Sequence, residues 1–531
     1  MMFGLPGAQI YPLFDALHAT DIEIIVPRHE QTAGYMAMGY AKSSGRPGVF
    51  CVVPGPGVLN AATALCTAMG NCSAVVCLTG QVPSQYLGKG RGHLHELKDQ
   101  RGTLGSITKD AVRIDVLGDT STIINEAFRT ARGGRPGPVA VEVCWDTMAE
   151  TAHAVIEPAN PGVAEPEPDL DAIAAAAGLL AAAQRPMIMC GAGAQGARDA
   201  VLALAETMNT PVTAFRSGRG IVADDHALAA PPVAARELWD DVDVLLGIGS
   251  RLEMPYMRWG DMMRYEPRPS GGPKLIRIDI DPLEMTRLVP DVGIVADAGT
   301  ACRLLTDRLA AVSSPSAGRL DEIARARAVA DGLIRQIQPQ AAYLEVIRDV
   351  LPRDAFLVPE LSQVGFATYT GAWPVLEPRT YVTEGYQGSL GFGFPTALGV
   401  KATHPDRVVV SITGDGGFMF AAQELATAAQ YDIGLVILVF NNGGYANVLR
   451  DQQQRFGGRV IGARFNNPDF VSFAESCGVT ARRVSTPRGL RPVLETAVAS
   501  GKPVLIEIEI APGTETSPWP LIHMARRPSL G

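Results

Sequence analysis

Residues 408–442 read VVVSITGDGGFMFAAQELATAAQYDIGLVILVFNN, and this stretch decides the fold. The apolar run 408–412 predicts a strand, the pattern over 420–431 predicts a helix, and the apolar run 434–440 predicts a second strand. A strand–helix–strand unit places its two strands parallel in one sheet. We therefore predict an α/β fold in which Gly414-Asp415-Gly416 and Asn441-Asn442 lie together at the carboxyl edge of a parallel sheet.

The residue types at this edge suit a metal ion that is shared with a diphosphate. Glycines let the backbone approach a phosphate closely, and the N-terminus of the following helix offers unpaired N–H groups to phosphate oxygens. Asp415 and an asparagine amide supply the hard oxygen ligands that Mg²⁺ prefers. An ordinary β-turn is the simpler interpretation of Gly-Asp-Gly when it is met alone.

Three further segments accompany this unit: 27–31 (PRHEQ), 55–60 (GPGVLN) and 383–398 (TEGYQGSLGFGFPTAL). In this order, the four motifs resemble those of the thiamine-diphosphate enzymes, and the nearest branch is acetolactate synthase-like. The resemblance covers almost the whole chain. It implies an α/β protein of three doubly wound parallel-sheet domains, which are a pyrimidine-binding domain, a Rossmann-like middle domain and a diphosphate-binding domain.

The resemblance also implies a set of cofactor and metal ligands. Asp415 and Asn442 would bind Mg²⁺ through their side chains and Gly444 through its carbonyl, and two diphosphate oxygens and a water would complete the octahedron. Gly388 matches a carbonyl that accepts from the cofactor's 4′-amino group, and Leu390 matches the apolar side chain that bends the cofactor. The residues implied to bind the cofactor are Pro56, Asn60, Ser362, Gln363, Gly388, Leu390, Gly414, Asp415, Gly416, Gly417, Asn442, Gly444 and Tyr445.

Glu30 follows the predicted strand 22–26, stands just before the predicted helix 31–43, and matches the family's catalytic glutamate. A carboxyl group beside the pyrimidine N1′ can exchange a proton with that nitrogen and so favour the reactive tautomer of the cofactor. The simpler alternative is a carboxylate that complements the helix dipole. Core packing is the corresponding alternative for Leu390, and an ordinary turn for Ser362-Gln363.

The substrate pocket departs from the family pattern. Acetolactate synthases carry a methionine and a tryptophan soon after the asparagine pair, where this chain has Asn447 and Asp451. The family's Phe-Gln-Glu triplet appears as Leu94-His95-Glu96. Histidines here could hold a substrate carboxylate or move protons near neutral pH, or they could simply be solvated on a glycine-rich loop. The residues expected around the substrate are Ala8, Gln9, His93, His95 and Asn447.

Composition limits the class of protein. A chain of 531 residues is too long for one core, so about three domains are expected. The net charge of −9 leaves no basic surplus for nucleic acid or an anionic membrane. Eight scattered cysteines form no CxxC pair or zinc spacing, which indicates reduced thiols. Without a signal-peptide pattern or an apolar run of membrane-spanning length, we expect a cytoplasmic protein.

Changes in composition along the chain predict the domain boundaries. We expect a pyrimidine-binding domain at 1–156, a linker at 157–168, a middle domain at 169–312, a second linker at 313–339, a diphosphate-binding domain at 340–512 and a tail at 513–531. Relatives carry a helix and a strand before the position that matches Gly4. Either a late start codon or a truncated edge of the first domain would explain this difference, and we favour the late start.

The middle domain carries Gly191-Ala-Gly193-Ala-Gln-Gly196 between a predicted strand and a predicted helix, the context of a dinucleotide fingerprint. That fingerprint also needs an acidic residue at the end of the next strand, whereas the strand 211–215 is followed by Arg216. This argues against an NAD-dependent dehydrogenase. Some relatives hold FAD or ADP in this domain without redox use. The sequence does not decide whether this domain binds FAD, binds ADP or binds no nucleotide.

Together these patterns predict an enzyme that uses thiamine diphosphate and Mg²⁺ to decarboxylate or ligate a small 2-oxo acid. The alternatives are a lyase for 2-hydroxyacyl-CoA or oxalyl-CoA, suggested by Asp99-Gln100, and a non-catalytic cofactor-binding relative. The resemblance implies a homodimer or a dimer of dimers with the active site at the interface. The segment 517–523 is expected either to cap the site as a lid or to be disordered.

Overall fold

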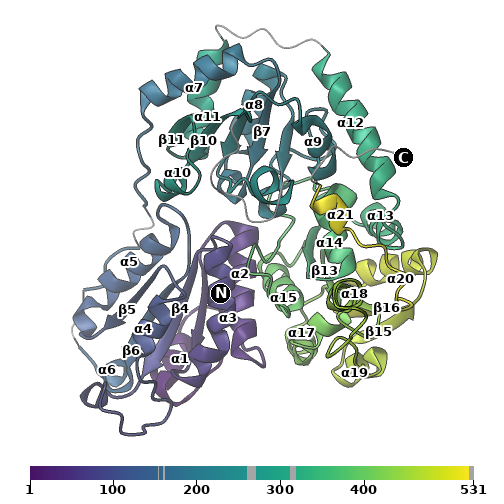
Figure 1. Cartoon of the computed structure of the whole chain (residues 1–531). Helices are drawn as coiled ribbons and strands as arrows, with labels where there is room; N and C mark the ends of the chain where they lie inside the picture. Colours follow the sequence, from purple (N-terminus) through teal and green to yellow (C-terminus); the bar gives the residue numbers. More distant parts are fainter. Residues whose placement is uncertain (153–154, 160–161, 260–270, 311–317, 525–531) are drawn as a thin grey trace.

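The computed structural model of the protein describes residues 1–152, 155–159, 162–259, 271–310 and 318–524. Figure 1 shows the middle domain above the N-terminal and C-terminal domains, which lie side by side. Each domain contains one sheet, and every strand pair in the three sheets is parallel. The predicted class of three parallel-sheet α/β domains is confirmed. Among the described residues, no helix is long and apolar enough to span a membrane.

The N-terminal domain has a six-stranded sheet in the order β2-β1-β3-β4-β6-β5. Its strands are β1 (Met2–Gly4), β2 (Ile24–Ile25), β3 (Gly48–Val52), β4 (Val75–Gln81), β5 (Asp110–Ile114) and β6 (Val139–Cys144). Its helices, with η for short 3₁₀ or π segments, are η1 (Ala8–Ile10), α1 (Tyr11–His18), α2 (Glu30–Ser44), α3 (Pro56–Gly70), η2 (Ser84–Tyr86), α4 (Gln100–Gly105), η3 (Leu117–Asp119), α5 (Thr120–Arg132) and α6 (Trp145–Ala149). The first residues of the chain form β1, which pairs with both β2 and β3 inside the sheet.

The middle domain has a five-stranded sheet in the order β11-β10-β9-β7-β8. Its strands are β7 (Pro186–Cys190), β8 (Val212–Ala214), β9 (Val244–Ile248), β10 (Lys274–Asp279) and β11 (Val292–Val295). Its helices are α7 (Leu170–Ala182), η4 (Ala192–Ala194), α8 (Arg198–Met208), η5 (Arg216–Gly218), α9 (Pro232–Trp239), η6 (Met254–Arg258), α10 (Leu283–Arg287) and α11 (Ala298–Ala310). The described parts of the first predicted linker, 157–159 and 162–168, hold neither helix nor strand, and α12 (Arg319–Ile334) lies within the second.

The C-terminal domain has a five-stranded sheet in the order β12-β13-β14-β16-β15. Its strands are β12 (Phe356–Pro359), β13 (Val409–Gly414), β14 (Val436–Asn441), β15 (Thr480–Val484) and β16 (Val504–Glu509). Its helices are α13 (Gln340–Val350), α14 (Gln363–Ala367), η7 (Thr368–Ala372), α15 (Gly393–Thr403), α16 (Asp415–Phe418), η8 (Ala422–Glu424), α17 (Leu425–Gln430), α18 (Ala446–Arg455), α19 (Phe470–Ser476), α20 (Pro487–Ser500) and α21 (Trp519–Ile522). β12, β13 and β14 are neighbours, so their carboxyl ends meet at one edge.

The helix predicted over 420–431 differs from the structure. Helical backbone begins directly at Asp415, and the segment divides into α16, η8 and α17. The break falls near Phe420, whose Cβ lies so close to Gly391 that a side-chain carbon there would approach within 2.4 Å. This tertiary contact overrides the local helical pattern, as packing commonly does.

The N-terminal and C-terminal domains share one hydrophobic core through α2 and α15. Tyr35 on α2 packs edge-on against Phe392, with ring centroids 5.8 Å apart. The two helices approach so closely that a Cβ at Gly39 would lie 2.3 Å from the Thr396 carbonyl oxygen. Glycine is therefore needed at this contact, since any side chain would push the helices apart. The contact fixes the N-terminal and C-terminal domains of one chain against each other.

Candidate functional site

Asp415 follows β13 and is almost fully buried, with 2% of its surface exposed. Its Oδ2 accepts hydrogen bonds from the backbone N–H groups of Gly443 at 2.8 Å and Gly444 at 3.2 Å. The Asn467 amide donates to the same oxygen at 2.7 Å. Burial raises the pKa of Asp415, and these donors oppose the rise. The carboxylate is thus held in one orientation at the carboxyl edge of the sheet.

Asn442 follows β14 at the same edge, and its amide has one bonded end and one free end. Its Nδ2 donates to Glu515 Oε2 at 2.7 Å. Its Oδ1 is buried and accepts no hydrogen bond within the described part of the chain. Such an unpaired buried oxygen is costly unless a ligand completes it. The Asn442 oxygen fits a metal ligand.

The oxygen atoms that lie at this edge are of the kind that binds a Mg²⁺ ion. The described residues hold no cluster of three or more His, Cys, Asp or Glu, so a metal here depends on a mixed set of oxygens. The Asp415 carboxylate and the Asn442 Oδ1 are such oxygens, and the loop that carries Gly444 runs between them. Hard oxygen ligands with room left for diphosphate oxygens and water are typical of Mg²⁺ sites.

The Gly-Asp-Gly turn, where a phosphate was expected, is closely packed by an aromatic side chain. The Tyr445 ring packs on Gly416, where an added Cβ would lie 2.4 Å from a ring carbon. Tyr445 also packs edge-on against Phe465, with centroids 5.0 Å apart. The Gly416 N–H donates to Asp415 Oδ1 at 2.9 Å, so a phosphate would have to replace that bond to use this donor.

Ser362 and Gln363 begin α14 beside this edge. The Ser362 hydroxyl accepts from the Gly365 N–H at 3.1 Å, and the Ser362 N–H donates to the Glu360 carbonyl at 2.8 Å. Ser362 therefore acts as a helix cap, as the simpler interpretation of Ser-Gln expects. Gln363 differs, because its Oε1 is buried and accepts no hydrogen bond from the described residues.

Glu360, which the sequence patterns did not single out, supports the turn that carries Gly388 and Leu390. Its carboxylate accepts from the N–H groups of Gly391 and Gly393 and from the Thr413 hydroxyl, which precedes Gly414. Burial raises the pKa of Glu360 to about 7, and these donors oppose the rise. Gly388 has a φ of 63°, and Leu390 is only half-buried, so Leu390 is not a plain core residue.

The second half of the predicted site lies at the carboxyl edge of the N-terminal sheet. Glu30 is the first residue of α2, and Asn60 on α3 donates to Glu30 Oε2 at 2.9 Å. Pro56 and Asn60 are exposed. The buried side chain of Gln100 holds the turn before them, because its Oε1 accepts a hydrogen bond from the Gly55 N–H at 2.9 Å. The structure thus brings Glu30 and Asn60 together on one accessible surface.

Gln9 and His95 also meet at this edge. Gln9 is buried, its Nε2 donates to the Leu94 carbonyl at 2.9 Å, and its Oε1 lies 3.0 Å from His95 Nδ1. Because the Leu94 contact fixes the amide, neutral His95 carries its proton on Nδ1 and leaves Nε2 as an acceptor. Ala8 precedes Gln9 and is half-buried. The His93 ring instead packs against the Tyr86 ring, with ring centroids 4.1 Å apart.

Asn447 lies on α18 and is engaged by the C-terminal segment. Its Oδ1 accepts from Trp519 Nε1 at 2.7 Å and from Arg450 Nη2 at 2.6 Å. Arg450 also donates to the Ser517 hydroxyl. The described part of the predicted tail, 513–524, is therefore packed along the site, as a lid would be, while 525–531 lie outside the described residues.

A separate cavity of about 390 Å³ opens where the three domains meet. Gly191 and Gly193 lie in its wall, and their backbone contacts Gly249 so closely that a Cβ at Gly191 would lie 2.2 Å from the Gly249 oxygen. Arg216 is half-buried there and forms ion pairs with Glu253 at 3.4 Å and Glu384 at 3.8 Å, while its Nε and Nη1 form no hydrogen bond among the described residues. The basic residues in the wall are Lys42, Arg46, Arg132, Arg135, Arg216, Arg251 and Arg379.

Comparison with known families gives matches in all three domains. The chain matches "Thiamine pyrophosphate enzyme, N-terminal TPP binding domain" over 1–102, the central domain of the same enzymes over 173–305, and their C-terminal TPP binding domain over 362–508. Of the site residues described above, Glu360 and the C-terminal segment lie outside these ranges, as do Arg132 and Arg135 of the cavity wall.

Curated proteins match over nearly their full length. A probable acetolactate synthase large subunit of Methanococcus aeolicus is 32% identical, over 98% of this chain and 91% of that protein. Another probable acetolactate synthase large subunit, of Methanocaldococcus jannaschii, is 33% identical over 96% of this chain and 89% of that protein. A probable 2-ketoarginine decarboxylase of Pseudomonas aeruginosa is 33% identical over 96% and 91%. The activities in the names of these relatives differ, although the lengths of the matches are similar.

Proposed function

The chain belongs to the family of thiamine pyrophosphate (thiamine diphosphate) enzymes, and from that premise we propose that it decarboxylates a small 2-oxo acid with Mg²⁺ as the second cofactor. The fragment that remains would leave as an aldehyde or join a second carbonyl compound. The observation that carries the proposal is the pair of oxygens at one sheet edge, the fixed Asp415 carboxylate and the unpartnered Asn442 Oδ1.

Different residues of the chain would bind the metal ion, exchange a proton and support the cofactor. When bound, thiamine diphosphate supplies a carbon nucleophile for the ketone and accepts the electron pair left by CO₂. Asp415 and Asn442 would hold Mg²⁺ and, through it, the diphosphate. Glu30, oriented by the Asn60 amide, would place a carboxyl group beside the pyrimidine nitrogen and exchange a proton there. The half-buried Leu390 would support the cofactor's bent shape.

Two groups would distinguish the substrate from that of acetolactate synthases. His95, with Nε2 left as an acceptor by Gln9, can bind a polar substrate group or take up and return a proton. Asn447 makes the other side of the pocket polar, although its oxygen is already held by Trp519 and Arg450. The relative named as a 2-ketoarginine decarboxylase supports a 2-oxo acid with a polar tail as one candidate substrate.

The CoA thioester alternative gains no support from Asp99-Gln100. Asp99 caps α4 by accepting from the Gly102 N–H at 2.8 Å. Gln100 is buried and donates to the Gly80 carbonyl at 3.0 Å, besides holding Gly55. Both residues thus have structural roles within the N-terminal domain.

A panel of 2-oxo acids tests the proposed activity. We expect CO₂ release from at least one short or polar-tailed 2-oxo acid, at least about 100-fold above the rate without protein, because decarboxylases exceed uncatalysed rates by far more. The release should need both thiamine diphosphate and Mg²⁺ and should stop when a chelator is added. CO₂ and aldehyde assays, with CoA thioesters as controls, give the result. Turnover of the thioesters alone would reject the 2-oxo acid substrate.

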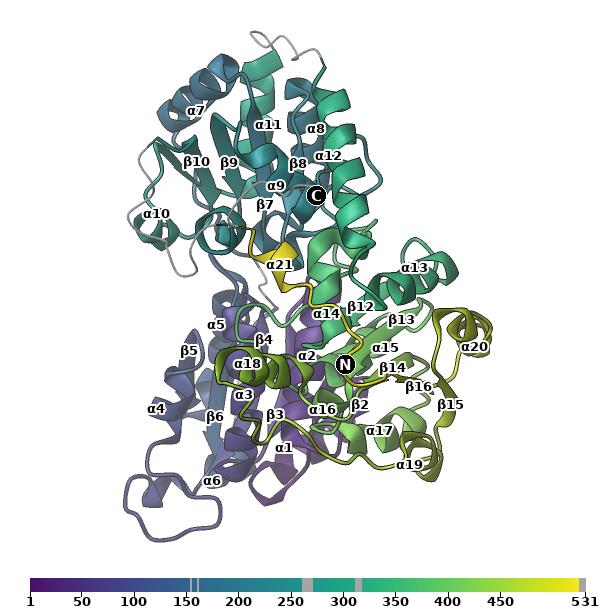
Figure 2. The ribbon, with the colours of Figure 1, turned by 45° about the vertical axis from the view of Figure 1, so that its right-hand side comes forward.

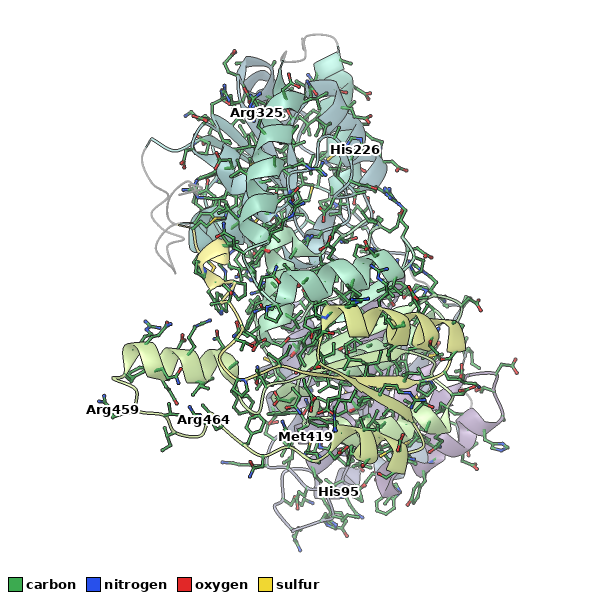
Figure 3. All side chains as sticks on the ribbon, turned by 90° about the vertical axis from the view of Figure 1, so that its right-hand side faces the viewer. His95, His226, Arg325, Met419, Arg459 and Arg464 are labelled. Atoms are coloured by element: carbon green, nitrogen blue, oxygen red, sulfur yellow. The ribbon has the colours of Figure 1, made fainter. Side chains whose placement is uncertain are left out.

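We also propose that two chains form each active site in a homodimer, alone or paired into a tetramer. Exposed apolar side chains lie beside both halves of the site: Leu59 next to Asn60, and Met419 and Phe420 after the Gly-Asp-Gly turn. Figure 3 shows the segment with Arg459 and Arg464 projecting with α18 from one side of the molecule. That segment exposes Phe456 and Ile461, the latter at 82%. Exposed apolar surface of this kind favours a partner subunit.

For the cavity between the domains we propose an ADP-containing ligand, either ADP itself or FAD. Its support is the glycine-rich backbone of one wall, the many cationic side chains, and the Nε and Nη1 groups of Arg216, which form no hydrogen bond among the described residues although the guanidinium is ion-paired with Glu253 and Glu384. Cationic groups and close backbone are what a pyrophosphate requires.

Heat-denatured protein should release that nucleotide in about one copy per chain. Chromatography of the supernatant measures it: a visible flavin band identifies FAD, and an ultraviolet-absorbing peak that elutes with ADP, apart from thiamine diphosphate, identifies ADP. An Arg216→Gln variant should retain less, because it removes a cation from the cavity. A supernatant with neither the flavin band nor the ADP peak, together with no binding of added ADP or FAD, would contradict the proposal.

A further inference from the structure

The C-terminal segment 513–524, here called the strap, runs from β16 past the diphosphate edge to the middle domain (Figure 2). Its first anchor is at Thr516, whose N–H donates to the Gln338 carbonyl at 2.8 Å and whose carbonyl accepts from Gln340 Nε2 at 2.7 Å. Glu515 directly precedes Thr516, whose N–H and carbonyl are both hydrogen-bonded. Its carboxylate therefore projects from a fixed point of the backbone.

The strap is also fixed further along the chain. Trp519 packs against Phe366 with ring centroids 4.8 Å apart. The Met524 carbonyl accepts from Arg236 Nε at 2.9 Å, and Arg258 lies 2.9 Å from His523 Nε2. These contacts join the strap to α14 and to the middle domain. The strap is thus anchored at several points from Thr516 to Met524.

Glu515 dictates which way the Asn442 amide faces. A carboxylate can only accept hydrogen bonds, so the end of the amide that touches Glu515 must be the NH₂ group. That bond is 2.7 Å long and leaves Asn442 Oδ1 on the opposite side, buried and unpartnered. If the amide turned over, two acceptors would face each other and an N–H donor would face the metal position.

We propose that Glu515 is a positioning residue: it holds Asn442 Oδ1 toward the metal, so that the strap contributes to the affinity for Mg²⁺ and the diphosphate. This inference rests on the metal–diphosphate site of the proposed function. Groups that orient a metal ligand through a hydrogen bond typically change metal affinity by about 10-fold to 100-fold when removed. The effect acts on binding before any substrate is present.

The test compares Glu515→Ala and Glu515→Gln in the full-length protein. Mg²⁺ is titrated at a fixed thiamine diphosphate concentration, and cofactor binding is followed by calorimetry or intrinsic fluorescence, without substrate. We expect Glu515→Ala to raise the half-saturating Mg²⁺ concentration about 10-fold. Glu515→Gln keeps an acceptor oxygen for the Asn442 NH₂ group and should stay within about 3-fold of the unmodified protein.

Glu509→Ala is the matched control, because Glu509 is exposed at the end of β16, where its side chain forms a 3.7 Å ion pair with Arg483. Its Mg²⁺ dependence should not change. Equal Mg²⁺ dependence in Glu515→Ala and the unmodified protein would overturn the proposal, as would an equal loss in the Ala and Gln variants. A lower unfolding temperature of Glu515→Ala with unchanged Mg²⁺ dependence would show a merely structural strap. If the unmodified protein itself binds no thiamine diphosphate with Mg²⁺, the proposed function fails instead.

Discussion

A Glu30→Gln variant is expected to lose about 10²–10⁴-fold in kcat while still binding thiamine diphosphate and Mg²⁺. Glu30 has one hydrogen bond from the described residues, the 2.9 Å contact from Asn60, and lies at the start of α2. The substitution keeps the shape and the ability to accept that bond but removes the group that can exchange a proton. Steady-state kinetics on the best 2-oxo acid and a separate cofactor titration measure the two effects.

Glu23→Gln provides the control for Glu30→Gln, because Glu23 is an exposed glutamate a few residues earlier in the chain. Its activity should equal that of the unmodified protein. The proton-exchange role is wrong if Glu30→Gln turns substrate over at the normal rate. A variant that loses cofactor binding to the same extent as kcat would show that Glu30 contributes to binding alone.

Mixing two inactive variants should restore activity. Asp415→Asn alone should weaken Mg²⁺-dependent cofactor binding by about 100-fold, since it removes the one carboxylate of the metal site and turns an NH₂ group toward existing donors. In a hybrid dimer of Glu30→Gln and Asp415→Asn chains, a site built from both chains would combine the intact Glu30 of one with the intact Asp415 of the other. Random pairing then restores about a quarter of the sites.

Co-expression of the two chains with different affinity tags gives the hybrid for assay, and sedimentation gives its size. Each variant expressed alone controls for residual activity. A site contained within one chain predicts no recovery in the hybrid. A monomer that retains full activity in sedimentation would also rule out the shared site.

The sequence predicted those parts of the site whose geometry is local. Asp415 and Asn442 each directly follow a strand, and neighbouring parallel strands end at one edge, so their proximity follows from the pattern alone. For two neighbouring strands, short-range chain geometry thus determines the long-range contact. Glu30 and Asn60 were both implied by resemblance, but Glu30 follows β2 and Asn60 lies after β3, and β1 separates these strands, so their 2.9 Å contact does not follow from strand adjacency.

The parts of the site that the sequence did not predict depend on hydrogen bonds between distant segments of the chain. Asn467 bonds to Asp415 from 52 positions further on, and Glu515 reaches Asn442 across 73. Glu360 holds Gly391 from 31 positions away. No periodicity or spacing connects these pairs, since loop closure over such lengths leaves many contacts equally accessible. A single acidic residue after a strand or in a tail carries no signal by itself.

The glycine contact between α2 and α15 has a consequence for how the chain reaches its native state. Tyr35 and Phe392 share one core although the whole middle domain lies between them in sequence. The cooperative unit is therefore discontinuous: the face of α2 that packs against α15 stays exposed until the last third of the chain has been synthesised. Contacts of such high sequence separation form slowly and leave apolar surface exposed meanwhile. During synthesis the middle domain can fold first, and the two cofactor-binding domains then close together as a single late event.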